Sequence, residues 1–533
     1  MSGRLTLTWA NKEKALLSLG ESGYEWVDRD DPRVREVRLL DETGRVGETT
    51  GNPGDNLLIR GDSLDALRAL VRTPEYAEVY RGKVKLVYID PPFNTGQAFE
   101  HYDDSLEHSV WLGMMRERLV LIRELLAPDG SVWVHLDDAE MAYCKVLMDE
   151  VFGRKNFVAT VVWQKRYSRE NRSAIGGVHD YLIVFAPLGS DWKLVRNRIE
   201  RTSSKEYRNP NADPRGNWRA IPLDVQAGHA TASQFYEVVT PGGKIHRPST
   251  GRAWSVTEPR MQQLRDAGLV YFGKDGNGKP NLIRYLDEDT GLVPWTWWPH
   301  EEVGHNDEAK KEIKAFFPEL EPFDTPKPER LLNRVIEIAS NPGDIVLDCF
   351  AGSGTTAAVA QKMGRRWVTV ELNEKTAHTF TKPRLEKVVR GEDPGGITES
   401  TGWSGGGGFR DLRIAASVWD VISDSLGTAV FQADGVENAT LARAVAAQLG
   451  YTTIPHPVFA GRKGRSLLAV ATGVVDAVAV ADIVSALGSG ETALIAALSC
   501  TEDASTTLRE LSRGSRILRM PSELFPSTGT VTR

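Results

Sequence analysis

Asp90, Pro91, Pro92 and Phe93 form a tetrad whose groups could hold a flat aromatic amine. An ionised aspartate only accepts hydrogen bonds, and Pro91 offers a carbonyl oxygen with no competing N–H. The nitrogen of an aromatic exocyclic amine is a poor nucleophile, because its lone pair is delocalised into the ring. Two acceptors on its N–H groups can favour a tetrahedral nitrogen that attacks a methyl donor in line. The tetrad therefore suits methyl transfer to such an amine.

The Phe93 ring offers a face for a nucleic-acid base, and stacking of this kind is worth about 1–3 kcal/mol per base. A base in a duplex must leave the helix before an enzyme can reach it, so stacking would offset part of that cost. The two prolines restrict the backbone and would keep these groups in place. The alternative is a turn that ends a strand and has no catalytic role.

A glycine loop, DCFAGSGTT, lies between an apolar strand pattern and an alanine-rich helix pattern at 348–356. Gly352 and Gly354 allow a sharp turn close to a ligand, and the helix that follows directs free N–H groups toward it. Glu371 ends the next strand, where a carboxylate can accept both ribose hydroxyls. The pattern fits a nicotinamide dinucleotide or S-adenosylmethionine, and a turn without a ligand remains an alternative. No GxxxxGK[ST] motif indicates a nucleoside-triphosphate loop.

Both motifs follow predicted strands in α/β patterns. The sequence predicts strands at 85–90 and 131–137, with helices at 110–126 and 139–152. A second block predicts a helix at 328–340, strands at 344–348 and 365–371, and a helix at 355–363. Strand–helix alternation of this kind predicts a doubly wound, Rossmann-like α/β sheet.

Changes in composition divide the chain into segments. A loop-rich stretch separates the two α/β blocks, and a glycine-rich stretch precedes the C-terminal segment. We expect an N-terminal extension (1–54), a catalytic half (55–189), an insert (190–320), a cofactor half (321–393), a linker (394–408) and a small C-terminal α/β domain (409–533).

The 533 residues exceed what one hydrophobic core normally organises, and the net charge of −7 provides no general attraction for nucleic acid. Three scattered cysteines lack the spacing of a zinc site or a disulfide framework, so we expect no metal. Neither a secretory signal nor a membrane span is evident, which favours the cytoplasm. Any contact with nucleic acid must come from local basic patches.

The motifs resemble those of the permuted (beta) group of DNA amino-methyltransferases, in which the tetrad precedes the target-recognition domain and the cofactor loop. Here LVYIDPPFNTG precedes IVLDCFAGSGTTAAVA, with a long insert between them. Further similar stretches are LLIRGDSLDAL, HDYLIVFA, TPKPERLLNRVI and RRWVTVELNE. Together they cover most of residues 55–385. The resemblance implies a circularly permuted methyltransferase fold that binds S-adenosylmethionine and contains an inserted target-recognition domain.

The resemblance also implies roles for individual residues. Asp90, Pro91, Pro92 and Phe93 would be catalytic, Glu371 would hold the ribose, and Asp62 would lie near the adenine of the cofactor. Other predicted cofactor contacts are Phe350, Ala351, Gly352, Gly354, Thr355, Lys327 and Pro328. In this family an initial Asp in the tetrad accompanies adenine N6 and an initial Ser accompanies cytosine N4, so Asp90 favours adenine. The usual aromatic residue is Tyr, and Phe93 departs from it but can still stack on a base. A cytosine-N4 enzyme, an enzyme acting on RNA or protein amides, and a catalytically silent DNA-binding subunit remain alternatives.

DPPFNTG and the chain length resemble the Mod subunits of type III restriction–modification systems. That resemblance implies a site-specific enzyme that flips adenine out of double-stranded DNA. It also implies a homodimer formed through the C-terminal domain. No helicase or nuclease motif is evident, so restriction would need a separate subunit.

A basic cluster next to aromatic residues could contact DNA phosphates. It comprises Lys165, Arg166, Arg169 and Arg172, with Trp163 and Tyr167 beside them. A solvated charged face is the alternative. For the Trp-rich run at 294–300, core packing is favoured over a base wedge, and His135 and His179 are expected to be structural.

Overall fold

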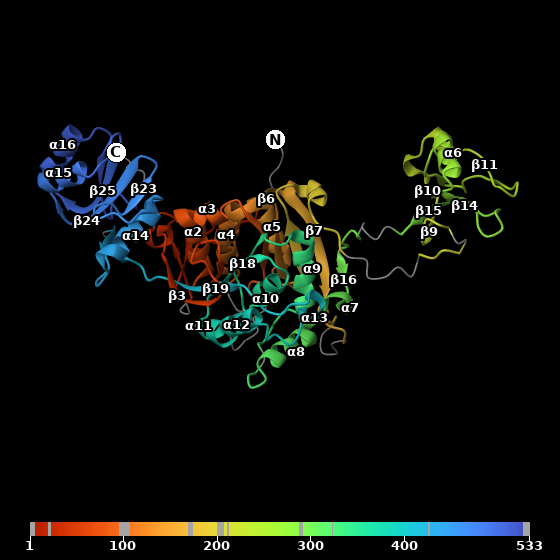
Figure 1. Cartoon of the computed structure of the whole chain (residues 1–533), viewed down its shortest axis with the longest axis horizontal. Helices are drawn as coiled ribbons and strands as arrows, with labels where there is room; N and C mark the ends of the chain where they lie inside the picture. Colours follow the sequence, from red (N-terminus) through yellow and green to blue (C-terminus); the bar gives the residue numbers. More distant parts are fainter. Residues whose placement is uncertain are drawn as a thin grey trace. The chain divides into compact units, whose positions relative to one another are not determined.

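The computed structural model describes residues 6–19, 23–94, 107–168, 174–199, 207–210, 213–286, 291–321, 323–424 and 427–525. The chain forms two compact units, which Figure 1 shows with colours that follow the sequence from the N-terminus to the C-terminus. Unit 1 comprises Met1–Asn197 and Trp295–Arg533, and unit 2 comprises Arg198–Pro294. The motifs that suggest chemistry all lie in unit 1.

A ten-stranded sheet forms the centre of unit 1. Across the sheet the strands are β16 (Trp297–Trp298), β7 (Phe157–Gln164), β8 (His179–Phe185), β6 (Leu126–Leu136), β5 (Val84–Ile89), β17 (Ile345–Asp348), β18 (Arg366–Glu371), β4 (Asn56–Arg60), β19 (Gly408–Ile414) and β3 (Leu40–Gly47). The strands from β6 to β19 pair in parallel. β8 is antiparallel to both β6 and β7, and β3 is antiparallel to β19.

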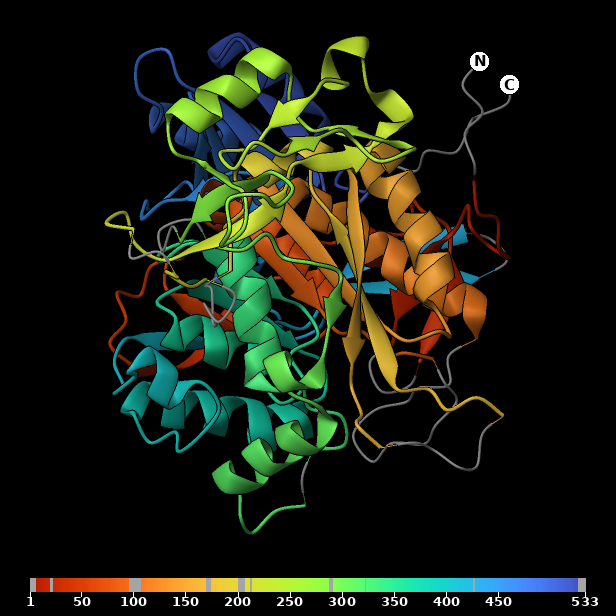
Figure 2. The same cartoon turned by 90° about the vertical axis from the view of Figure 1, so that its right-hand side faces the viewer.

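Helices cover both faces of this sheet (Figures 1 and 2). One layer contains α2 (Ser63–Arg72), α3 (Pro74–Tyr80), α4 (His108–Leu125) and α5 (Met141–Met148). The other contains α9 (Glu329–Ala339), α10 (Thr355–Lys362) and α12 (Lys382–Arg390). The residues from Leu86 to Ile89 of β5 are at most 1% exposed, as expected for a strand covered on both sides. The predicted doubly wound α/β fold is confirmed.

The predicted elements lie close to the observed ones. The helix expected at 110–126 is α4, and the strand expected at 85–90 is β5. β6 begins at Leu126, five residues before the predicted start at 131. The helix expected at 139–152 is α5 followed by a π-helical turn at Asp149–Gly153.

The central sheet extends beyond the segment boundaries expected from composition. β3 lies within 1–54, β16 within 190–320, and β19 spans the end of the glycine-rich stretch. β19 pairs with β4, so the backbone groups along that edge of β4 are hydrogen-bonded rather than open to another chain. Phe409 and Leu412 of β19 are fully buried. Sheet pairing, which composition does not report, therefore sets these boundaries.

Smaller elements complete unit 1. A hairpin of β1 (Ala15–Ser18) and β2 (Tyr24–Val27) packs against α4, where the Trp26 ring leaves no space for a side chain at Gly113. The other helices are α1 (Pro32–Arg35), α7 (His300–Val303), α8 (Asn306–Phe316), α11 (Glu374–Thr376) and α13 (Thr398–Thr401).

Unit 2 has its own small core, formed by Leu223, Val238, Trp254, Met261 and Phe272. Its strands are β9 (Trp218–Pro222), β10 (Asp224–Gln226), β11 (Val238–Val239), β12 (Ile245–His246), β13 (Arg252–Trp254), β14 (Val270–Tyr271) and β15 (Asn281–Tyr285), and its helix is α6 (Glu258–Asp266). They form short antiparallel sheets, which fits the loop-rich texture of this part of the sequence.

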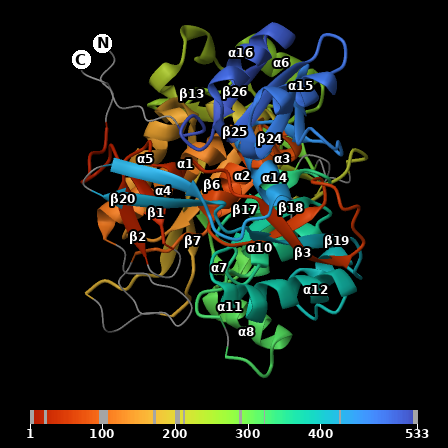
Figure 3. The ribbon, with the colours of Figure 1, turned by 90° about the vertical axis from the view of Figure 1, so that its left-hand side faces the viewer.

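The C-terminal segment has a separate five-stranded sheet (Figure 3). Its strands are β22 (Thr452–Thr453), β23 (Gly461–Lys463), β24 (Ser466–Val475), β25 (Thr492–Cys500) and β26 (Arg516–Arg519). They are accompanied by α14 (Asn438–Leu449), α15 (Ala477–Ser485) and α16 (Glu502–Leu511), after a hairpin of β20 (Trp419–Asp424) and β21 (Gly427–Gln432). Within the described ranges no helix has the length and apolarity needed to cross a bilayer.

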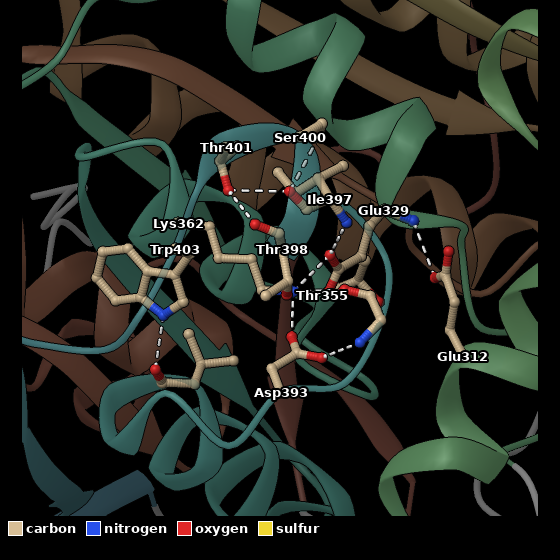
Figure 4. Close-up of polar contacts among 12 residues, drawn as sticks. Glu312, Glu329, Thr355, Lys362, Asp393, Ile397, Thr398, Ser400, Thr401 and Trp403 are labelled. Atoms are coloured by element: carbon tan, nitrogen blue, oxygen red, sulfur yellow. Dashed lines mark hydrogen bonds and ion pairs between the residues drawn. The ribbon is translucent and has the colours of Figure 1, made fainter.

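Four charged side chains form a buried network beneath the glycine loop, part of which Figure 4 shows. Lys362, the last residue of α10, donates to both carboxylate oxygens of Glu329 at 2.9 and 2.7 Å and also pairs with Asp393. Arg384 of α12 donates to Glu329 Oε1 at 2.8 Å, and the Ile397 N–H donates to Oε2 at 2.9 Å. The charges of these four side chains balance, so their burial is tolerated only while every partner is present.

We expect Lys362→Met to lower the free energy of unfolding by about 3–5 kcal/mol, because Asp393 would lose the cation that it pairs with and Glu329 would keep only Arg384 in a dry site. Chemical denaturation followed by circular dichroism would measure the change. Lys193→Met, the same substitution at an exposed position, is the control and should stay within about 0.5 kcal/mol of the unsubstituted protein. Equal effects of the two substitutions would contradict a stabilising role for the network.

Candidate functional site

The tetrad and the glycine loop lie at neighbouring strand ends. β5 and β17 are parallel neighbours, with Val87 opposite Leu347. Asp90 follows Val87 by three residues and Phe350 follows Leu347 by three, so both lie beyond the carboxyl ends of their strands. Open α/β sheets bind their ligands at these ends. Two stretches more than 250 residues apart in the sequence are therefore side by side in the fold.

Asp90 has one carboxylate oxygen engaged and one without a partner. Oδ2 accepts a hydrogen bond from Lys327 Nζ at 2.5 Å, whereas Oδ1 is buried and accepts none within the described part of the chain. The backbone after Asp90 is held by Trp111, whose Nε1 donates to the Pro92 carbonyl at 2.7 Å. The tetrad thus presents an acceptor on a fixed backbone.

Phe93 lies against an aromatic and charged cluster. Its ring centroid is 5.8 Å from that of His135, and Lys327 Nζ lies 5.1 Å from it. His135 Nδ1 is 2.7 Å from the Tyr88 hydroxyl, and His135 Nε2 is 3.5 Å from Asp180 Oδ2. His135 is fully buried and supports the Phe93 ring, which agrees with the structural role expected for it.

The glycine loop is shaped by hydrogen bonds and positive φ angles. Gly352 has φ +51° and Gly354 has φ +79°, a region that L-residues with a side chain rarely adopt. The Gly352 N–H donates to Glu371 Oε2 at 2.8 Å, and the Ala351 N–H donates to the Val370 carbonyl at 2.9 Å. Thr355 begins α10 at the end of the loop, and its hydroxyl accepts from Arg384 Nη1 at 2.8 Å.

Two buried carboxyls beside the loop have raised pKa values. Burial raises the pKa of Asp348 to about 7, against the lowering effect of hydrogen bonds from the Thr356 hydroxyl and the Phe350 N–H. Burial likewise raises the pKa of Glu371 to about 7, although the N–H groups of Asn373 and Gly352 oppose the shift. Both groups therefore titrate close to neutral pH.

Asp62 caps α2 and also faces a buried arginine. Its Oδ1 accepts from the Leu64 N–H and from Arg118 Nη2, both at 2.7 Å, while the buried Oδ2 has no partner among the described residues. Arg118 also lies 5.9 Å from the centre of the Phe350 ring. Asp62 thus lies next to the glycine loop, and its expected place near the adenine of the cofactor stays a prediction.

The sequence analysis did not identify several residues of this site. Arg118 lies on the apolar face of α4, and a charge at such a position was the available signal. Phe323 packs 3.4 Å from the position that a side chain on Gly352 would take, and nothing in the sequence indicated it. Asp180 supports His135, and its signal was its place in the stretch HDYLIVFA. Lys327 is described with its ammonium group donating to Asp90 Oδ2, and its contact with the cofactor stays a prediction. Pro328, which directly precedes α9, is buried.

The predicted basic cluster is only partly described. Lys165 is not free to contact phosphate, because its Nζ donates to Asp180 Oδ1 at 2.5 Å, a buried carboxylate. Arg166 is exposed, whereas Arg169 and Arg172 lie outside the described residues. In the Trp-rich run, Trp298 is fully buried and stacks on Trp133 with centroids 6.0 Å apart. Trp295 is 57% exposed, so core packing accounts for only part of that run.

These features define an α/β protein in which a glycine loop and the Asp90–Phe93 tetrad lie at the same edge of the sheet. Residues 84–382 match the DNA methylase family, and the chain belongs to that family. It is 35% identical over 332 residues to the type III restriction-modification enzyme StyLTI Mod subunit of Salmonella typhimurium, covering 57% of this chain and 49% of that one.

Two further proteins are similar in sequence to this chain. A probable type III restriction-modification enzyme HindVI Mod subunit of Haemophilus influenzae is 30% identical, with 69% of this chain and 56% of that one covered. The type II methyltransferase M.EcaI of Enterobacter cloacae is 29% identical, with coverage of 56% and 64%. The chain spans about half the length of each of these two Mod subunits.

Gly354→Ala should destabilise the protein by about 1–2 kcal/mol, because the left-handed conformation at this position is costly for a residue with a Cβ. The added methyl group would also lie 3.2 Å from Thr381 Cγ2. Thermal unfolding would detect the loss. Gly177→Ala is the matched control, since nothing lies within 4 Å of its Cβ position, and an equal loss there would contradict the assigned constraint.

Proposed function

We propose that the chain is a site-specific DNA methyltransferase that transfers a methyl group from S-adenosylmethionine to adenine N6. The observation that carries this proposal is the position of Asp90 beside the glycine loop, with one buried carboxylate oxygen that has no partner among the residues the structure describes. An unsatisfied buried acceptor is costly in a folded protein, so a donor from a ligand is expected there.

The residues around the loop fit S-adenosylmethionine. Asp62 Oδ2 is a buried acceptor without a partner in the described ranges, suited to the amino group of the cofactor's adenine. The Glu371 carboxylate lies where ribose hydroxyls would donate to it, and the positive-φ glycines leave room for close approach of a ligand. The cofactor supplies an electrophilic methyl group on a sulfonium.

The tetrad would hold the flipped-out base. Asp90 Oδ1 and the Pro91 carbonyl would accept from the two N–H groups of the target amine, which favours a tetrahedral nitrogen. The Phe93 ring would stack on the base and offset part of the cost of flipping. Adenine is favoured over cytosine because the tetrad begins with Asp.

The partners are part of the same proposal. Two of the relatives are named Mod subunits of type III restriction-modification enzymes, which supports double-stranded DNA as substrate and a separate restriction subunit with helicase and nuclease activity. Recognition of the target sequence is assigned to the 190–320 insert, dimer formation to the C-terminal domain, and the location to the cytoplasm. Arg166 remains a candidate for phosphate contact.

Asp90→Ala should reduce methyl transfer at least 1,000-fold while leaving the dissociation constant for S-adenosylmethionine within about threefold, because the carboxylate holds the base and not the cofactor. Mass analysis of nucleosides from treated DNA would measure N6-methyladenine, and calorimetry would measure binding. N4-methylcytosine as the product would overturn the choice of base. No methylated nucleoside from the unsubstituted protein would favour a silent DNA-binding subunit.

Glu371→Gln should weaken the binding of S-adenosylmethionine and flatten its pH dependence. A pKa of about 7 leaves Glu371 mostly protonated at pH 6 and mostly ionised at pH 8. Since the ionised form accepts the ribose hydroxyls, affinity should rise about tenfold over that range in the unsubstituted protein. Asp348→Asn is the control for the neighbouring carboxyl of similar pKa. A slope that survives in Glu371→Gln and disappears in Asp348→Asn would reassign the titrating group.

A further inference from the structure

Lys327 directs its ammonium group at the catalytic tetrad. Its Nζ donates to Asp90 Oδ2 at 2.5 Å and lies 5.1 Å from the centre of the Phe93 ring. The side chain of Lys327 is 8% exposed and that of Asp90 is 20% exposed, so the pair is largely shielded from water. One cation therefore contacts both of the tetrad side chains that would touch the target base.

The two oxygens of Asp90 have different environments. Oδ2 is bound by Lys327, and Oδ1 is buried without a partner among the described residues. A carboxylate held at one oxygen cannot rotate freely about its bond to Cβ, so the direction of the other oxygen is fixed as well. This is the arrangement needed when one specific acceptor must meet one N–H of an incoming amine.

We propose that Lys327 is a positioning residue for methyl transfer, which holds Asp90 Oδ2 so that Oδ1 faces the amino group of the target base. This inference rests on the proposed function. It assigns Lys327 to the substrate side of the site, whereas the resemblance alone places the residue among the predicted cofactor contacts.

The neighbouring carboxyl makes such a cation necessary. Asp348 ends β17 next to β5, and the charge of Asp90 opposes ionisation of Asp348 while that of Lys327 favours it. Two carboxyls at adjacent strand ends repel each other when both are ionised. Without the ammonium group, Asp90 would turn away from Asp348 and lose its direction toward the base.

The backbone of Lys327 is anchored two residues later. Glu329 begins α9 and is bound by Lys362 (Figure 4). Arg384 of the same buried network donates to Glu329 as well. Arg384 also donates to the Thr355 hydroxyl at the end of the glycine loop. The same network thus holds both the segment that carries Lys327 and the loop proposed to bind the methyl donor. Through Lys327 it would therefore keep Asp90 at a fixed position relative to that donor.

Steady-state kinetics of the full-length protein on DNA would test the role. Lys327→Met should lower kcat about 10- to 100-fold, as expected for a misplacement of about 1 Å, while KM for S-adenosylmethionine changes less than threefold. Lys327→Arg, which keeps the charge, should recover part of the loss. Lys83→Met, at an exposed position just before β5 and so at the opposite end of that strand from the tetrad, is the matched control and should leave kcat unchanged. A wild-type kcat in Lys327→Met, or a rise in KM for the cofactor alone, would overturn the proposal.

A measurement that needs no turnover separates this inference from the proposed function. Unfolding temperatures of Asp90→Asn, Lys327→Met and the double variant form a cycle that reports the coupling of the pair. We expect the double variant to unfold at a temperature no lower than that of the less stable single variant. Additive shifts would overturn the ion pair even if the protein methylates DNA. A coupled pair in a protein that gives no methylated nucleoside would instead overturn the proposed function.

Discussion

Parallel pairing of β5 with β17 is the constraint on which the site depends. Neighbouring strands lie about 4.8 Å apart, so the segments that leave their carboxyl ends must run next to each other. Asp90 leaves one strand and the glycine loop leaves the other. Covering helices bury both strands, which fixes their register because a shift would move apolar side chains out of the core. The distance between tetrad and loop is therefore a property of the sheet rather than of flexible loops.

The site concentrates carboxyl groups and balances them with few cations. Asp62 faces Arg118, Asp90 faces Lys327, and Asp348 lies between the tetrad and Glu371. Such a cluster would suit the proposed cofactor, which carries a positive sulfonium, and the charge of the site changes near pH 7 because the pKa values of Asp348 and Glu371 are raised to about 7. The same crowding makes the direction of each carboxylate depend on its partner. A small number of ion pairs thus controls both charge and geometry.

Two networks of buried polar side chains support the tetrad and the glycine loop. On the tetrad side, the His135 ring contacts that of Phe93, and His135 is linked in turn to Tyr88, Asp180 and, through Asp180, Lys165. On the loop side, the network around Glu329 connects α9, α10 and α12. Buried charges of this kind add little net stability, but removing one partner is costly. Their presence in both halves of the domain is consistent with a need for fixed geometry.

The sequence by itself determined the α/β class, the two motifs and most residues of the site, because strand and helix periodicity and glycine spacing are local properties. It did not determine that Lys165 binds Asp180, that Lys327 reaches Asp90, or that Arg118 faces Asp62. It also did not place β3 and β19 in the central sheet. Those features join residues far apart in the chain, and only tertiary packing decides which buried charges meet.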